Sequence, residues 1–504
     1  MIAKTHSAIP YGFNGKLVEV EGDMNRGLPA FNIVGMANKT INEAKERVRS
    51  AIVNSGFYFP DKKVTISLAP AELLKDGAYL DLPIALSVLV LSGQLTRNDI
   101  AESLFVGELS LNGEIRPVRG IINVVEVAKE AGYSKIFVPK DNLNQATLVD
   151  DIEVIGVETL QGLYLGLKGQ VELDIISKPS TVLEGPNSSE KGPFLDYIHG
   201  QDLAKRAMAI AIAGHHNILI SGPPGAGKTL LAKAAANLLP GLSPNEIVDI
   251  TKIYSIAGLA TGEVVTSRPF RNPHHTASAT SIIGGGMVAG PGEISLAHKG
   301  ILFLDELPEF QRAVLESLRQ PMEDKTITIS RANRKTKYPA DFMLIATMNP
   351  CPCGYLGDTS HECKCTEMQI QSYRKKLSGP LFDRIDLNIE VQKVPIEDLR
   401  RKVPRKIHEH NVVKNTITDA IMRQKARFGR DGIYNSSLSS FEVSQRLKLE
   451  TSAEKLLASA SERLQLSARS YFKTIKVAQT IADMDNSDII KRHHIAEALT
   501  YRRR

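Results

Sequence analysis

The chain has 504 residues, of which 42% are hydrophobic, and its net charge is +6. This length predicts roughly two to four domains, because a single hydrophobic core stops growing at about 250–300 residues. The first residues lack the charged and apolar segments of a signal peptide, and the most apolar stretch, residues 82–91, is far shorter than a bilayer span. We therefore expect a cytoplasmic protein without a membrane partner. In that reducing compartment its four cysteines would not form structural disulfides.

Residues 1–173 are expected to form an α/β or α+β domain, because short strand-like runs alternate there with helical patterns. The strand-like runs include 15–20 and 63–68, and a helix is expected over 42–55. Residues 174–192 are rich in Ser, Pro, Gly and charge, a composition typical of a linker. The sequence thus predicts an N-terminal domain that is joined by a linker to a larger second part.

The second part contains a phosphate-binding loop that fits the pattern G-x-x-x-x-G-K-[ST] and follows the strand-like run 217–221. Glycines let the backbone direct its N–H groups at phosphate oxygens, while the lysine adds charge and the threonine a hydroxyl for Mg²⁺. The helix expected over 230–239 would point its positive end at the same phosphates. We expect ATP to be held by these residues: Gly222, Pro223, Pro224, Gly225, Ala226, Gly227, Lys228 and Thr229.

Polar side chains follow two apolar strands further along the chain. Residues 300–304 end at Asp305 and Glu306, about eighty residues after the loop, and residues 341–348 end at Asn349. We expect Asp305 to hold Mg²⁺ together with Thr229, and Glu306 to orient and deprotonate the attacking water. Asn349, on a neighbouring parallel strand, would position that water.

Two segments between these motifs carry basic residues. Residues 261–293 combine arginines and histidines with three glycines at 284–286, which indicates a moving loop with anionic contacts. Residues 325–330 alternate as a strand and lead into a basic hairpin tip. Such a tip could hold a phosphate backbone without reading bases, whereas the alternative is an ordinary solvated turn. The basic residues of the tip are Arg331, Arg334, Lys335 and Lys337.

All four cysteines lie in one short window as two Cys-x-Cys corners: Cys351, Cys353, Cys363 and Cys365. Four thiolates suit a closed tetrahedral Zn²⁺ site that would make a small loop rigid, and His361 could replace one sulfur. The alternative is a redox-sensitive or coincidental cluster. We expect a structural role, because four protein ligands leave no open position for substrate.

From residue 396 the pattern is helical, with amphipathic segments over 453–466 and 475–484 and a last helix over 489–499. This segment has an excess of Lys and Arg and ends in three arginines, so it can meet polyanions. A solvated helical surface is the alternative interpretation of the same charges.

Residues 75–79 (Lys-Asp-Gly-Ala-Tyr), 107–118 and 131–142 resemble segments of the proteolytic domain of the Lon family. That family uses a Ser/Lys dyad, in which the lysine is the base for the serine nucleophile. Here Tyr79 falls where the serine should be and Ile122 where the lysine should be. A phenol is a poor nucleophile at its usual pKa and isoleucine cannot take a proton. The resemblance therefore implies a non-proteolytic domain for assembly or substrate contact.

The order of the motifs over nearly the whole chain resembles the magnesium-chelatase-like AAA+ family of the ComM/YifB type. The resemblance implies a multidomain α/β fold: a Lon-protease-like α+β domain (1–173), a P-loop AAA+ parallel-sheet core (193–395) with a Cys-rich insertion (349–366), and an α-helical lid (396–504). It also implies roles for two arginines. Arg384 would reach the nucleotide of the neighbouring subunit, with a local salt bridge as its alternative, and Arg469 would be a second sensor of the γ-phosphate.

For function, the family implies a hexameric ring that hydrolyses ATP and acts on single-stranded or branched DNA, with branch migration in recombination or natural transformation. One alternative is a magnesium-chelatase-type motor subunit, although the chain has the extra Lon-like domain and lacks an Asp-x-Ser-x-Ser stretch. Another is an assembly or regulatory protein that uses ATP only as a switch.

Overall fold

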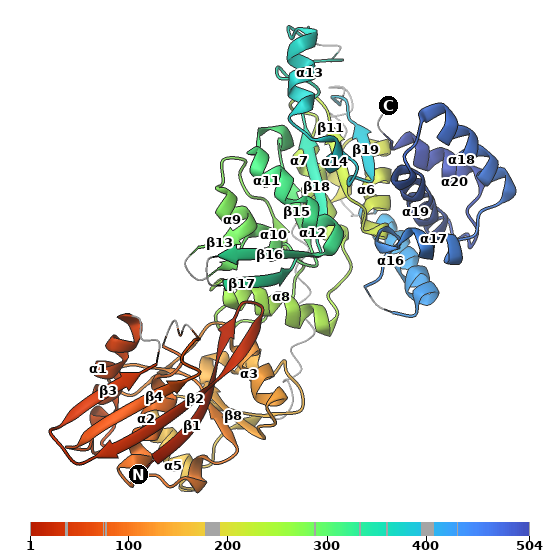
Figure 1. The fold of residues 1–504 in the computed structure, drawn as a ribbon. Coiled ribbons are helices and arrows are strands. Elements are labelled where there is room, and N and C mark those ends of the chain that lie inside the picture. Colours follow the sequence, from red (N-terminus) through yellow and green to blue (C-terminus); the bar gives the residue numbers. More distant parts are fainter. Residues whose placement is uncertain are drawn as a thin grey trace.

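The computed structural model describes residues 2–35, 39–73, 75, 78–176, 192–286, 289–331, 334–358, 361–394, 408–430 and 432–502. Figure 1 shows an elongated molecule with an N-terminal α/β body at one end, a central sheet, and a group of C-terminal helices beside that sheet. Most of the expected linker, residues 177–191, and the first residues of the expected lid, up to 407, lie outside the described part.

The N-terminal body is built on an eight-stranded mixed sheet in the order β10-β9-β8-β5-β1-β2-β4-β3. The runs predicted as strands at 15–20 and 63–68 lie within this sheet, and the predicted helix 42–55 coincides with α1 to within three residues at its start. The strands are β1 (Ile2–Tyr11), β2 (Asn14–Asn25), β3 (Ala30–Val34), β4 (Lys63–Ala69), β5 (Ser103–Phe105), β8 (Lys135–Pro139), β9 (Glu153–Val157) and β10 (Ile175–Ile176), with a separate small hairpin of β6 (Glu108–Leu109) and β7 (Ile115–Arg116).

Helices cover this sheet: α1 (Lys39–Asn54), α2 (Asp81–Leu91), α3 (Ile121–Glu130), α4 (Leu143–Ala146) and α5 (Leu160–Leu167). Every residue of α2 is buried, as expected for a helix that is apolar on all sides. Among the described helices, none is both long enough and apolar enough to cross a bilayer. Ile122 is fully buried in the cluster against which Tyr79 packs, so the two positions that depart from the Lon pattern lie in one apolar environment.

The central sheet has five parallel strands in the order β12-β15-β18-β11-β19. Its side chains alternate between two hydrophobic cores: Ile218 and Ile220 belong to one, whereas Leu219 belongs to the other. A sheet buried on both faces explains why the strands are apolar runs rather than alternating ones. The strands are β11 (Ile218–Ser221), β12 (Phe270–Arg271), β15 (Ile301–Leu304), β18 (Met343–Met348) and β19 (Leu387–Glu390).

Helices and two hairpins surround this sheet. The helices are α6 (Asp202–Gly214), α7 (Lys228–Leu238), α8 (Pro244–Ile256), α9 (Ala279–Ile283), α10 (Glu293–Leu296), α11 (Arg312–Ser317), α12 (Arg319–Asp324), α13 (Glu367–Lys375) and α14 (Gly379–Phe382). The hairpins are β13 (Gly284–Gly285) with β14 (Gly290–Pro291), and β16 (Thr326–Arg331) with β17 (Arg334–Pro339).

The C-terminal part is helical, as predicted, and packs on α6 through α16 and α19. The helix expected from residue 475 begins earlier, at residue 468, because the Ser467 side chain accepts a hydrogen bond from the Ser470 N–H and caps it. The helices are α16 (Glu409–Phe428), α17 (Ser440–Arg446), α18 (Thr451–Leu464), α19 (Ala468–Met484) and α20 (Arg492–Thr500).

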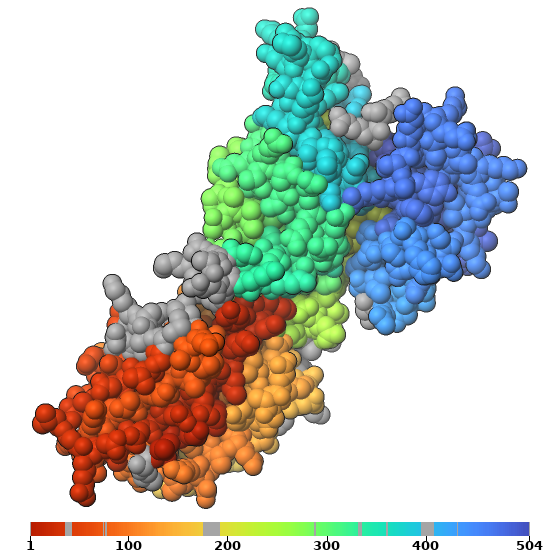
Figure 2. All heavy atoms as spheres, in the orientation of Figure 1, coloured from red at the N-terminus to blue at the C-terminus, as the bar shows by residue number. Residues whose placement is uncertain are grey.

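The N-terminal body contacts the core through α8, the residues after it, and the tip between β1 and β2 (Figure 2). Gln145 of α4 donates to the carbonyl oxygens of Ala260 and Glu263 at 2.8 and 2.7 Å. Ser255 of α8 donates to the Gln145 side chain at 2.9 Å and accepts from the Gly120 N–H, also at 2.9 Å. Because Gln145 and Ser255 are buried, these hydrogen bonds fix the direction in which the body docks.

Candidate nucleotide-binding site

The phosphate loop joins β11 to α7 at the carboxyl edge of the parallel sheet. Gly225 and Gly227 have φ angles of +79° and +82°, a conformation that favours glycine, and nothing lies within 4 Å of the position of a Cβ on either. The loop backbone is therefore free for the close approach of a phosphate chain. Lys228, the first residue of α7, lies at the mouth of this loop.

The Lys228 ammonium bridges the loop to the neighbouring strand. It donates to the carbonyl oxygens of Gly222 and Pro223, and at 3.1 Å to Oδ1 of Asn349, which directly follows β18. Burial lowers the pKa of Lys228 from its usual value, while the charges of Asp305 and Glu306 oppose that shift. The structure thus brings Lys228 and Asn349 together, as the two strand ends predict.

Asp305, at the end of β15, accepts two hydroxyl hydrogen bonds. One comes from Thr229 at 3.1 Å, and the other comes from Thr347 of β18. Thr347 is fully buried, and its hydroxyl also accepts the Glu306 backbone N–H at 3.1 Å. Sequence motifs missed Thr347, although a hydroxyl inside an apolar strand is a signal, since a buried polar group needs a partner.

Glu306 follows Asp305 in the left-handed backbone region, with φ 55° and ψ 51°. This conformation is costly for a residue with a side chain and occurs most often where function demands it. The Glu306 carboxylate is half exposed, and its Oε2 lies 3.8 Å from Nδ1 of His275. His275 comes four residues after β12 and so reaches the same sheet edge, a neighbour that the sequence did not indicate.

The two arginines of the same segment are bound within the chain. Arg268 pairs with Glu246 at 2.9 Å, and Arg271 pairs with Glu293 at 2.6 Å. Both guanidinium groups make two hydrogen bonds to their carboxylate, which is the strong form of this pair. They therefore organise the loop rather than offer free charge to an anion.

Arg384 and Arg469 meet at one carboxylate, that of Glu323 in α12. Arg384 pairs with it at 2.6 Å and also donates to the carbonyl oxygens of Arg319 and Pro380. Arg469, in the first turn of α19, pairs with the other Glu323 oxygen. The ion pair of Arg384 is therefore with Glu323 of another helix, and not the local salt bridge to Asp383 or Asp386, its neighbours in sequence. Sequence reasoning did not identify Glu323.

The basic hairpin has one buried and one open face. Ile327, Ile329 and Tyr338 pack into the core, whereas Lys335 and Lys337 are exposed. The two lysines share a hollow of about 640 Å³ with residues of β16 and α12, namely Gln320, Asp324, Thr326 and Thr328. The side chains of Arg331 and Arg334, the other two predicted DNA contacts, lie outside the described part of the structure.

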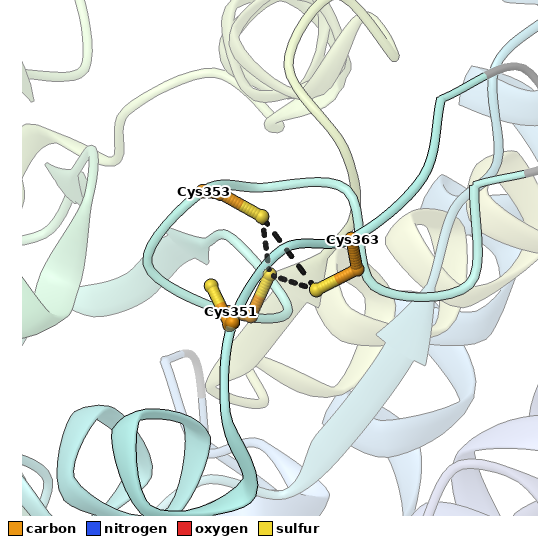
Figure 3. Close-up of side chains that lie close together, drawn as sticks. Cys351, Cys353 and Cys363 are labelled. Carbon is orange, nitrogen blue, oxygen red and sulfur yellow. Dashed lines mark hydrogen bonds between the residues drawn. The ribbon is translucent and has the colours of Figure 1, made fainter.

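The four cysteines form one cluster, and Figure 3 shows three of them, Cys351, Cys353 and Cys363. The Sγ atoms of Cys351, Cys353 and Cys363 are 3.4 to 3.6 Å apart, and those of all four cysteines lie within 4.8 Å of one another. Zinc bound to four sulfurs at about 2.3 Å would hold them roughly 3.8 Å apart. The cluster can therefore bind a metal ion.

Three family descriptions match successive segments of the chain. Magnesium chelatase, subunit ChlI, matches residues 194–399, subunit ChlI of Mg-chelatase matches 20–142, and magnesium chelatase, subunit ChlI C-terminal, matches 408–502.

Individual relatives match over nearly their full length. The chain is 42% identical over 498 residues to YifB of Escherichia coli (strain K12), which covers 99% of this chain and 96% of that protein. It is 40% identical over 515 residues to the competence protein ComM of Haemophilus influenzae, with 99% and 97% covered. A shorter match, 41% over 88 residues, relates 17% of this chain to 21% of the DNA repair protein RadA of Streptococcus pneumoniae. The chain therefore belongs to the magnesium-chelatase-like AAA+ family of the ComM/YifB type.

Proposed function

We propose that this chain is an ATPase that works as a ring-shaped DNA motor, of the helicase or branch-migration kind, in recombination or natural transformation. The observation that carries the ATPase is that the phosphate loop, the Asp305–Glu306 pair and Asn349 meet at one edge of a parallel sheet. This edge is where ligands bind in open α/β sheets.

The residues at this edge fit ATP with Mg²⁺. The Thr229 hydroxyl and the Asp305 carboxylate, 3.1 Å apart, are the oxygen donors that Mg²⁺ prefers. Lys228 bonds only neutral oxygens in the described residues, and phosphate oxygens would be stronger acceptors for it. The metal ion would neutralise charge on the β- and γ-phosphates when bound.

The catalytic roles follow from position. Glu306, half exposed beside the loop, would take the proton of the attacking water, and Asn349 would orient that water. Arg384 would complete the site of a neighbouring subunit in a ring, which we propose to be a hexamer, and Arg469 would be a second sensor of the γ-phosphate. In support, Glu323 pairs with both guanidinium groups and so holds the two arginines next to each other.

DNA would bind to the open face of the β16–β17 hairpin. Lys335 and Lys337 lie on this face beside threonine hydroxyls, a combination suited to phosphate contacts without base recognition. Arg331 and Arg334 would add charge at the tip. The names of ComM, a competence protein, and RadA, a DNA repair protein, support DNA as the partner. We also propose that the cysteine cluster holds Zn²⁺.

ATP hydrolysis measured without DNA, with single-stranded DNA and with forked DNA tests this function. We expect that single-stranded DNA or forked DNA increases the rate of ATP hydrolysis. We also expect that the protein unwinds a labelled branched substrate only when ATP is present. Lys228→Ala is the control that removes the phosphate contact. If neither DNA changes the rate of ATP hydrolysis and no strand is unwound, the motor hypothesis is wrong and an ATP-dependent switch is favoured. If hydrolysis depends on added chelatase partner subunits, the magnesium-chelatase hypothesis is favoured.

A further inference from the structure

The cysteine cluster lies directly against the phosphate loop. Cys351 is two residues after Asn349, and Gly354 directly follows Cys353. A methyl group at Gly354 would lie 2.7 Å from Cδ of Pro224 in the phosphate loop, and 3.9 Å from Cγ of Asn349. The backbone of the cysteine loop therefore packs on the phosphate loop so closely that only glycine fits at the contact.

The other end of the cysteine loop leads to α13. Thr366 directly follows Cys365 and caps α13, since its side chain accepts the Gln369 N–H and the Gln369 side chain accepts the Thr366 N–H. Tyr373 of α13 is buried, and its hydroxyl oxygen accepts a hydrogen bond from the Asn349 backbone N–H; burial raises the pKa of Tyr373 to about 12. Helix α13, which follows the cysteine cluster in sequence, therefore contacts Asn349, which precedes the cluster.

A third contact ties the loop to the sheet. Lys393, just beyond β19, pairs with the nearly buried carboxylate of Asp358, and its ammonium lies 5.3 Å from the centre of the Tyr355 ring. Tyr355 stacks on His361 with ring centres 4.9 Å apart. The cluster therefore occupies the point at which β18, β19, α13 and the phosphate loop come together.

The described part of residues 350–365 contains neither helix nor strand. A loop of this kind has few backbone hydrogen bonds to hold its shape, so its two ends would be free to move relative to each other. One metal ion bound by four sulfurs from both ends removes that freedom, because the loop can then close in only one way.

We propose that Zn²⁺ bound by the four cysteines is a positioning element of the ATPase site, which holds Gly354 against Pro224 and so fixes Asn349 beside Lys228. This inference rests on the ATPase proposed above. Asn349 acts on the attacking water, whereas Lys228 and Thr229 are held by α7. Loss of zinc should therefore lower turnover much more than nucleotide affinity.

The test is the double variant Cys363→Ser/Cys365→Ser, compared with the wild type purified under reducing conditions. Zinc per chain, the Kd of a fluorescent ATP analogue, and kcat are measured. The wild type should hold one zinc ion per chain and the variant none, with Kd within about threefold and kcat lowered about tenfold or more. The single variant Cys363→His should bind zinc and have a kcat close to that of the wild type, because histidine is an ordinary zinc ligand. Glu362→Gln, exposed in the same loop, is the matched control.

A second variant leaves the sulfurs intact. Gly354→Ala should retain zinc, because it removes no ligand, and should lower kcat because its methyl group separates the two loops. If the double serine variant does not fold, Gly354→Ala still tests the inference.

Three results would overturn the inference: a wild-type protein without zinc, a zinc-free variant whose kcat is within twofold of the wild type, or a fall in nucleotide affinity as large as the fall in kcat. If the wild type does not hydrolyse ATP, the proposed ATPase function is wrong instead. The measured zinc content would still show whether the four cysteines bind a metal ion.

Discussion

The hydroxyl of Thr347 serves both acidic residues of the site, since it donates to Asp305 and accepts the Glu306 N–H. Thr347→Val keeps the size of the side chain but leaves a partly buried carboxylate oxygen of Asp305 and the backbone N–H of Glu306 without this partner. A lost hydrogen bond of this kind costs about 1–3 kcal/mol. We expect a kcat lower by about tenfold and a higher Mg²⁺ requirement in steady-state kinetics. Thr347→Ser should behave as the wild type, and an unchanged Mg²⁺ dependence in the valine variant would contradict this role.

Glu306 is the residue to which we assign proton removal from water. Glu306→Gln keeps the shape of the side chain and removes its basicity. Nucleotide binding should persist while hydrolysis falls by about 100-fold or more, because the general base is lost. Glu309→Gln, on an exposed glutamate of the same segment that pairs with Lys376, should leave turnover unchanged. Equal hydrolysis in Glu306→Gln and the wild type would show that another group is the base.

Sequence reasoning located residues whose role depends on local pattern. Lys228 and Asp305 were predicted because a glycine loop or an apolar strand directly precedes each of them, and the structure places both at the carboxyl edge of the sheet. Glu323 and His275 could not be predicted in this way. Their partners lie at least thirty residues away, and nothing near either residue in sequence marks the contact.

At the scale of elements, the β16–β17 hairpin is the candidate for the part that moves DNA. Lys335→Ala with Lys337→Ala removes two exposed charges from its open face and leaves the buried residues in place. We expect weaker DNA binding and a salt dependence whose slope falls by about 2, as for two lost phosphate contacts. Fluorescence anisotropy at several salt concentrations measures this. Lys62→Ala with Lys63→Ala, exposed in the N-terminal body, is the matched control. Equal losses in both variants would mean that binding is non-specific.

Helices and strands were predicted well where a single hydrophobic periodicity or a single capping residue determines their position in the sequence. The apolar strands of the central sheet and the C-terminal helices lie where the sequence places them, and the start of α19 was missed because a single serine cap extends it. The docking of the N-terminal body could not be predicted. Gln145 and Ser255 are far apart in sequence, and a polar residue that becomes buried at such a contact resembles any surface residue until its partner is known.

At the scale of the whole molecule, an ion pair and a cation–π contact add to the hydrogen bonds that join the N-terminal body to the core. Lys252 of α8 pairs with Glu126 of α3, and its ammonium lies 4.3 Å from the centre of the Phe13 ring. A Cβ on Gly12, beside Phe13, would touch Thr336 of β17. The N-terminal body therefore contacts the hairpin to which we assign DNA binding.

A ring in which Arg384 serves the neighbouring site makes a specific prediction for mixed assemblies. Arg384→Ala and Glu306→Gln should each be inactive alone, because one lacks the arginine and the other the base. In a ring mixed in equal parts, an Arg384→Ala subunit keeps its own base and can receive Arg384 from a Glu306→Gln neighbour. About a quarter of the interfaces would then be complete, and hydrolysis should recover to about that fraction of the wild-type rate.

The control for this experiment is Glu323→Gln, which removes the carboxylate that holds Arg384 but keeps the guanidinium. If Arg384 acts across the interface, this variant should retain more turnover than Arg384→Ala, because a mobile arginine can still reach the neighbouring nucleotide. No recovery on mixing, with Glu323→Gln as inactive as Arg384→Ala, would show that the ion pair matters only for the fold of its own chain. Recovery requires a second subunit, so it would also establish that the working protein is an assembly.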